Sequence, residues 1–195
     1  MGDSPSHLRI MPVNRTYAVR GGLACLLLAL ATHPAAAQSA GPADTLTFFG
    51  FRAGARVAEL AARLDSIDGT RLRCDHAKAD SHVAECRAVV GDPSLGGPVD
   101  LWLSAIDSVS GVMTLSADVS GEQLDTWRAE LERAYGRVGA QVQGNQWMMQ
   151  WVRKGRMIRL TWRTEKGNRV ASVSLIDGHV LDAWGRSRAR AGRRG

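Results

Sequence analysis

The sequence predicts an α+β fold, in which an antiparallel sheet carries two helices on one face as a two-layer sandwich. Three observations lead to this fold class. A capped amphipathic segment is typical of a helix, three alternating segments follow it as strands, and the same order of elements occurs earlier in the chain.

Residues 121–135 are predicted to form the second helix. Ser120 and Gln123 have the spacing of a capping box, in which the serine hydroxyl accepts a hydrogen bond from the backbone N–H of Gln123. Apolar residues then recur at helical spacing until Gly136 ends the pattern; they are Leu124, Trp127, Leu131, Ala134 and Tyr135. An apolar stripe of this kind needs a sheet to pack against.

Three strands are predicted after this helix, over residues 146–153, 156–164 and 169–177. Lys154-Gly155 suits a two-residue hairpin turn, which places Arg153 opposite Arg156 and fixes the pairing of all three strands. One face of this meander is then entirely apolar, and we assign its tryptophans to the core; they are Trp147, Trp151 and Trp162. A slip of one residue would expose that face, so the register is strongly specified.

The first half of the body repeats this order of elements. A strand at residues 46–51 precedes a helix that starts at Gly54 and ends at Gly69, and three strands follow, over residues 70–75, 82–90 and 99–105. The second half starts with a strand at residues 111–118. We therefore expect a duplicated β-α-β-β-β unit, with halves at 46–105 and 111–177 that share one sheet. Two separate small domains are the alternative.

Residues 1–37 have the organisation of a secretory signal peptide. Arg15 and Arg20 precede an apolar run, Gly21–Ala31, that is far shorter than the ~20 residues needed to cross a bilayer. Ala35-Ala36-Ala37 matches the pattern of a cleavage site. We expect a protein that is exported, to a periplasm or to the outside, after cleavage between Ala37 and Gln38. A short linker, 38–45, would then lead into a domain that spans 46–185.

The formal net charge of +6 is concentrated at the two ends of the chain. Residues 1–37 contribute +2 and residues 186–195, with five arginines, contribute +5, whereas residues 38–185 carry a net charge of −1. A domain without excess positive charge is not expected to bind nucleic acid specifically. We expect the tail, 186–195, to be disordered and to be attracted weakly to anionic surfaces.

Two cysteines, Cys74 and Cys86, remain after removal of the signal peptide. They share the inward face of a predicted hairpin, so we expect a disulfide, which the entropy model values at roughly 3 kcal/mol. The alternative is a periplasmic metal-binding protein in which Cys74, His76, His82 and Cys86 hold zinc or copper. Their spacing matches no standard zinc module, and we expect no cofactor.

No motif connects the chain to a catalytic mechanism or to a named family. Ser172 and Ser174 lack the surroundings of a nucleophile elbow, and neither a phosphate-binding loop nor a zinc-protease motif occurs. We therefore expect a non-catalytic module that binds an unknown protein or small ligand on the uncovered sheet face. The residues expected on that face are Trp102, Gln150, Arg159, Arg163, Ser172 and Ser174.

Export has a direct test, because cleavage would leave Gln38 as the first residue of the mature protein. Mass spectrometry of the exported protein should show a chain that lacks residues 1–37. An intact N-terminus on protein that stays with the cells would contradict the prediction.

Overall fold

The structure is a computed structural model, and it describes residues 45–67 and 69–193. The expected signal peptide, its cleavage site and most of the expected linker lie outside these residues.

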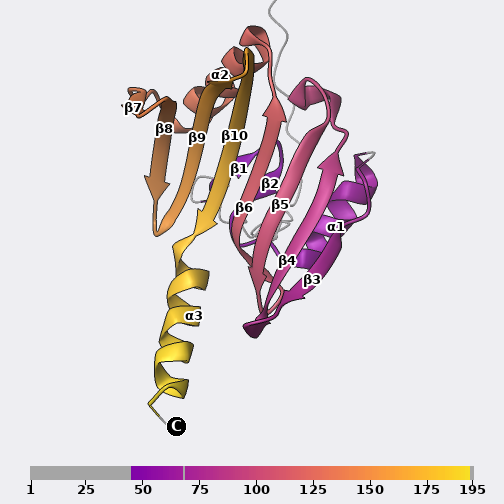
Figure 1. The fold of residues 1–195 in the computed structure, drawn as a ribbon, viewed down its shortest axis with the longest axis vertical. Helices are drawn as coiled ribbons and strands as arrows, with labels where there is room; N and C mark the ends of the chain where they lie inside the picture. The colour runs from indigo at the N-terminus through magenta and orange to yellow at the C-terminus, as the bar shows by residue number, and fades with distance from the viewer. Residues whose placement is uncertain (1–44, 68, 194–195) are drawn as a thin grey trace, which may run out of the picture. The chain divides into compact units, whose positions relative to one another are not determined.

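An eight-stranded antiparallel sheet dominates the fold (Figure 1). Its order is β3-β4-β5-β6-β10-β9-β8-β7, so β6 joins the strands of the first half of the chain to those of the second. The strands are β3 (Arg73–Ala77), β4 (Asp80–Val90), β5 (Val99–Ile106), β6 (Val109–Asp118), β7 (Gln141–Gln143), β8 (Gln146–Arg153), β9 (Arg156–Glu165) and β10 (Asn168–Asp177). The predicted α+β class with an antiparallel sheet is confirmed.

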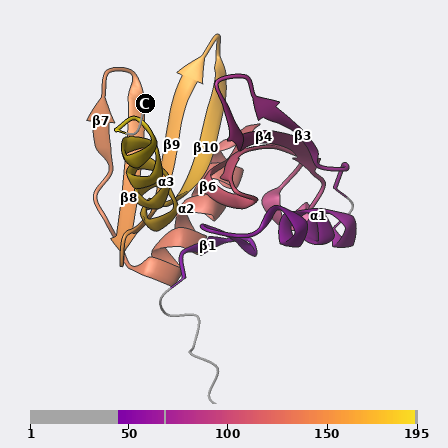
Figure 2. The ribbon, with the colours of Figure 1, turned by 90° about the horizontal axis from the view of Figure 1, so that it is seen from below.

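In the described residues three helices accompany the sheet, where two were expected. They are α1 (Val57–Ser66), α2 (Gly121–Tyr135) and α3 (Gly178–Ala191), and a short 3-10 helix, η2 (Pro93–Leu95), precedes β5. Figure 2 shows α1 and α2 on the same side of the sheet. None of the helices in the described part of the chain has the length and apolar character that a membrane crossing requires.

The first predicted strand does not join the main sheet. Residues 46–51 form β1 (Thr47–Phe48) and the start of β2 (Phe51–Arg52), which pair only with each other. Gly50, with a φ of 78°, lies in the turn between them, a conformation that glycine adopts without strain. The place beside β5 that a repeat would give to this strand is taken by β6.

The predicted register of the meander is confirmed. Arg153 pairs with Arg156, Trp151 with Ile158 and Trp147 with Trp162, and the next ladder places Trp162 opposite Ala171. Because side chains alternate between the two faces of a strand, this register sends Met149, Trp151, Ile158, Leu160, Val173 and Leu175 into one buried core. The core also contains Leu60 and Leu64 of α1 and Leu124, Trp127 and Leu131 of α2.

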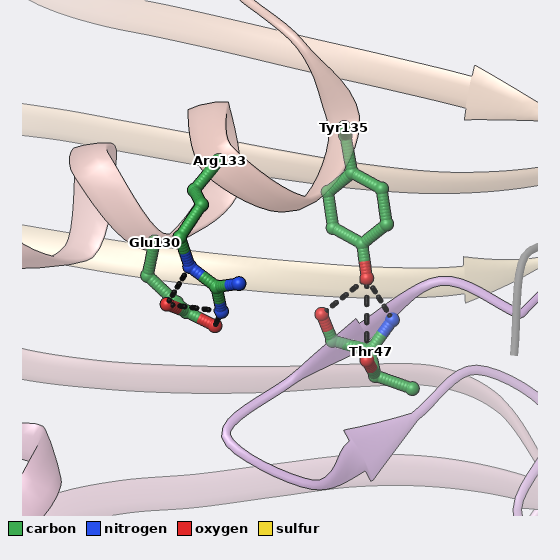
Figure 3. Close-up of polar contacts among 4 residues, drawn as sticks. All are labelled: Thr47, Glu130, Arg133 and Tyr135. Atoms are coloured by element: carbon green, nitrogen blue, oxygen red, sulfur yellow. Dashed lines mark hydrogen bonds and ion pairs between the residues drawn. The ribbon is translucent and has the colours of Figure 1, made fainter. Parts of the chain in front are cut away.

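The aromatic side chains around α2 have partners for their polar atoms. Trp127 Nε1 donates to the carbonyl of Leu95 (3.1 Å), and the hydroxyl of Tyr135 donates to the carbonyl of Thr47 (2.6 Å). Figure 3 shows Tyr135 reaching from the end of α2 to Thr47 of β1, while Glu130 and Arg133 pair with each other on the helix. These bonds attach β1 and η2 to α2.

The capping box of α2 is only half as predicted. Ser120 accepts from the backbone N–H of Gln123 (3.0 Å), as expected. The Gln123 amide, however, donates to the carbonyl of Leu95 (2.6 Å), so it fixes η2 against the helix.

The assignment of Trp147 to the core is wrong. Trp151 is buried, but the side chain of Trp147 is 46% exposed and lies beside Val142 of β7, which is 57% exposed. The ring of Trp147 stacks on that of the partly buried Trp162 at a centroid distance of 6.2 Å, and the Arg128 guanidinium lies over Trp162. Alternation fixes which face a side chain is on, but it does not say how far along that face a helix extends.

The C-terminal segment forms a helix where a disordered tail was expected from residue 186. Residues 186–191 continue α3, whose N-cap is Asp177: the Asp177 carboxylate accepts from the backbone N–H groups of His179 (3.0 Å) and Val180 (3.3 Å). Asp177 is 2% exposed and also accepts from Arg156 Nε at 2.7 Å. A side chain on Gly54 would collide with the Asp177 carboxylate, so the glycine makes room for this charge.

Removal of the Asp177 carboxylate should destabilise the fold strongly, because it leaves Arg156 without its ion pair and α3 without its cap. Asp177→Ala should lower the free energy of unfolding by roughly 3–5 kcal/mol in chemical denaturation. Asp182→Ala, at an exposed position of the same helix, is the matched control and should cost less than about 1 kcal/mol. Equal losses in the two variants would contradict this role of Asp177.

Candidate functional site

The sheet face opposite α1 and α2, called the open face below, carries a row of mainly polar residues. The strand pairings place one residue from each of seven neighbouring strands side by side. The row consists of Arg73, Arg87, Trp102, Thr114, Ser174, Arg159 and Gln150. Four of the six predicted binding residues therefore lie in a single row, and we call it the central row.

The other two predicted residues lie outside the central row. Ser172 pairs with Thr161 in the next row of the open face, and Arg163 pairs with Gln146 one row further along the strands. The structure therefore does not bring Arg163 next to Trp102, which is on β5.

The residues in the β8–β10 part of the open face bond mainly to each other. Arg159 donates from Nε (3.1 Å) and Nη2 (2.9 Å) to the side-chain oxygen of Gln150, and Arg163 Nε donates to Glu165 (2.6 Å). The hydroxyls of Ser174 and Ser172 pair with those of Thr114 (3.0 Å) and Thr161 (2.8 Å). A ligand that used these groups would have to replace bonds that already exist.

A strip of apolar side chains lies beside the central row, on its α3 side. Val112, Ile176, Met157 and Val152 are cross-strand neighbours on β6, β10, β9 and β8. The side chain of Val152 is 62% exposed. Apolar and polar groups are therefore adjacent on the open face, as they are in surfaces that bind other molecules.

The Trp102 end of the central row is hollowed. A cavity of about 580 Å³ is lined by Thr70, Arg71, Arg73, Arg87, Ala88, Val89, Asp100, Leu101 and Trp102. Trp102 itself is half-buried, while the three arginines are exposed. We call this group, Arg71, Arg73, Arg87 and Trp102, the arginine cavity.

The three arginines were not among the predicted site residues, although strand alternation in the sequence contained a signal for them. The hairpin that places Cys74 opposite Cys86 also places Arg73 opposite Arg87, on the other face of the same strands. Arg87 is in turn opposite Trp102. Arg71 precedes β3 in the structure, but the predicted strand over residues 70–75 contained it, and alternation in that strand puts it on the same face as Arg73.

The structure contains the predicted disulfide. Cys74 and Cys86 are directly opposite each other in β3 and β4 and are bonded, with Cα atoms 4.0 Å apart. Both sulfurs of the alternative metal site are thus used in the disulfide. His76 faces Ala84, whereas the Nδ1 atom of His82 lies 2.7 Å from a carboxylate oxygen of Asp107. Within residues 45–67 and 69–193, no group of three or more His, Cys, Asp or Glu side chains is arranged to hold a metal ion.

The turn between β3 and β4 instead forms a charged contact with α3. Trp184 Nε1 donates to a carboxylate oxygen of Asp80 (2.9 Å), and the backbone N–H of His82 donates to the other carboxylate oxygen (3.0 Å). Arg188 Nη1 lies 3.9 Å from the oxygen that Trp184 contacts. The hydrogen bond from Trp184 is the main reason that the pKa of Asp80 is below its usual value. The bond to Asp107 and its negative charge raise the pKa of His82.

Comparisons with known proteins do not identify the chain. A scan against protein-family models finds no match, and the searches of curated proteins and of solved structures find none either.

The contact between α3 and Asp80 has a titration signature. A lowered pKa means that the contact favours the charged carboxylate of Asp80. The contribution of this contact to the stability of the fold is therefore present above pH 3.8 and is lost as the pH falls through the lowered pKa. Trp184→Phe removes the indole donor and should raise the pKa of Asp80 toward 3.8 in an NMR titration of its carboxyl carbon. Arg188→Ala should raise it less, because its charge is a smaller cause. An unchanged pKa in the Trp184 variant would contradict the assignment.

Proposed function

We propose that this protein is an exported, non-catalytic binding module whose ligand or partner binds on the open face of the sheet. The observation that carries the proposal is the central row, which brings an aromatic side chain and several arginines together on the face opposite α1 and α2. Tryptophan and arginine are enriched at the energetic centres of interfaces, since both offer a large contact area with directional donors.

We also infer that the domain is a two-layer sandwich built from a duplicated β-α-β-β-β unit. In the second half, β6, α2, β8, β9 and β10 follow this order, and β6 pairs with β10. In the first half, α1, β3, β4 and β5 follow the same order, while β1 and β2 stand where the first strand would be. With α1 and α2 on one side, such a unit leaves the opposite side of the sheet available to a ligand.

The disulfide supports the proposed export, because disulfides persist in oxidising compartments and are rare in the cytosol. The hydroxyl pairs support a binding role over hydrolysis by Ser172 or Ser174. Each of these serines bonds to a threonine, whereas an activated serine needs an adjacent general base.

The proposal predicts that binding depends on the central row. The double variant Trp102→Ala with Arg159→Ala removes two side chains of the open face: Trp102 is half-buried, and Arg159 is bonded to Gln150. Neither lies in the core, so the melting temperature should stay within about 5 °C of that of the wild type. Recovery of the partner that the wild-type protein captures from the exported fraction should be lost. The partner is measured by quantitative mass spectrometry of the captured material.

A matched control exchanges the same residue types on the other side of the sheet. Trp147→Ala with Arg133→Ala removes an exposed tryptophan of the helix side and an exposed arginine of α2, and it should leave capture unchanged. Capture that survives in the central-row variant, or that fails equally in both variants, would sink the proposal.

A further inference from the structure

The arginine cavity concentrates positive charge that no group in the described structure neutralises by contact. Arg73 and Arg87 are directly opposite each other across β3 and β4, an arrangement of like charges that destabilises a sheet. Within residues 45–67 and 69–193, neither they nor Arg71 form an ion pair or a side-chain hydrogen bond. The arginines of the β8–β10 part of the face, by contrast, have Gln150 and Glu165 as partners.

Acidic residues are near the cavity but do not remove its charge. Asp75 and Glu85 face each other in the next row of the open face, where they line a separate cavity of about 400 Å³ together with Arg73 and Arg87. Neither makes an ion pair with an arginine of the part of the chain that the structure describes. Among the described residues that line the arginine cavity, Asp100 is the only acid, against three arginines, so this lining has an excess of positive charge.

The shape of the cavity and its remaining lining limit the kind of ligand. Its volume of about 580 Å³ is within the range of roughly 300–1,000 Å³ that is usual for small-molecule sites. Trp102 and Val89 provide apolar surface beside the guanidinium groups. Guanidinium groups bind oxyanions through two parallel hydrogen bonds, and an indole ring is a surface for a flat apolar group.

We propose that the arginine cavity binds a small soluble molecule that carries a dianionic phosphate-type group next to a flat ring. The anionic oxygens bind between Arg73, Arg87 and Arg71, and the ring lies against Trp102. A dianion fits the charge balance better than a single carboxylate, because three arginines face one aspartate. This inference rests on the proposed function, since it names the ligand class for one end of the open face.

The test uses phenyl phosphate as the probe, with inorganic phosphate and phenol as its two halves. In NMR titrations of the mature protein, phenyl phosphate should shift the indole resonance of Trp102 and bind more tightly than either half. Binding should weaken with added salt, because exposed charges are screened. Vesicles of phosphatidic acid in phosphatidylcholine should not compete with phenyl phosphate. Competition by the vesicles would overturn the assignment to a soluble ligand and indicate a lipid headgroup.

Variants separate a binding role from a structural one. Arg87→Gln should lower the affinity for phenyl phosphate by about tenfold or more, since it removes a charge-assisted contact. It should not lower the melting temperature, because it relieves the repulsion between Arg87 and Arg73. Arg133→Gln, at an exposed position of α2 where the arginine is paired with Glu130, is the control and should leave binding unchanged. Trp102→Leu should lower the affinity for phenyl phosphate to the affinity for inorganic phosphate. Circular dichroism would check that this variant is folded.

Two results would overturn the inference. One is the absence of a saturable shift with phenyl phosphate in the wild type. The other is an Arg87→Gln variant that melts at a lower temperature and binds the probe as before, which would mean that the arginines balance Asp75 and Glu85. Neither result touches the proposed function, which fails separately if the Trp102 and Arg159 double variant still captures its partner.

Discussion

The ladder between β6 and β10 is the contact on which the rest of the structure depends. Seven residue pairs, from Val170 with Asp118 to Ile176 with Val112, join the strands that precede α2, β3 to β6, to the strands that follow it, β7 to β10. The ladder aligns Leu115 with Val173 in the core and Thr114 with Ser174 on the open face. A slip of one residue would exchange these two faces and break the central row at its middle.

The two faces of this sheet satisfy their polar groups in different ways. On the helix side, the buried Trp127 and Trp151 and the partly buried Tyr135 donate to the carbonyls of Leu95, Gly136 and Thr47, in that order. Those bonds stabilise one arrangement of α2, β1 and η2. On the open face the β8–β10 end is bonded internally, whereas Arg73 of β3 and Arg87 of β4 are opposite each other and form no ion pair with any acid of the described residues. The arginines of the open face that form neither an ion pair nor a side-chain hydrogen bond within the described residues are therefore found at the arginine cavity.

Local sequence patterns predicted the parts of the fold that follow from alternation and from turns. The meander register follows from Lys154-Gly155, and the disulfide follows from the facing positions of Cys74 and Cys86. Helix α3 could not be predicted in this way. Its start depends on a buried carboxylate that also pairs with Arg156, and its Trp184 is held by Asp80, 104 residues away in sequence. The exposure of Trp147 depends on how far α2 extends over the sheet, which no local pattern encodes.

The sequence predicted Trp102 as a residue of the candidate site, but it did not lead us to the arginines beside it. Strand alternation placed Arg159 and Arg163 on the open face, but in the fold Arg159 bonds to Gln150 and Arg163 to Glu165. A ligand at Arg159 would exchange two existing bonds to Gln150 for new ones, so its net gain would be small. A ligand between Arg73 and Arg87 would replace like-charge repulsion with attraction. The same open face therefore offers more binding free energy at its β3–β5 end, although arginines occur at both ends.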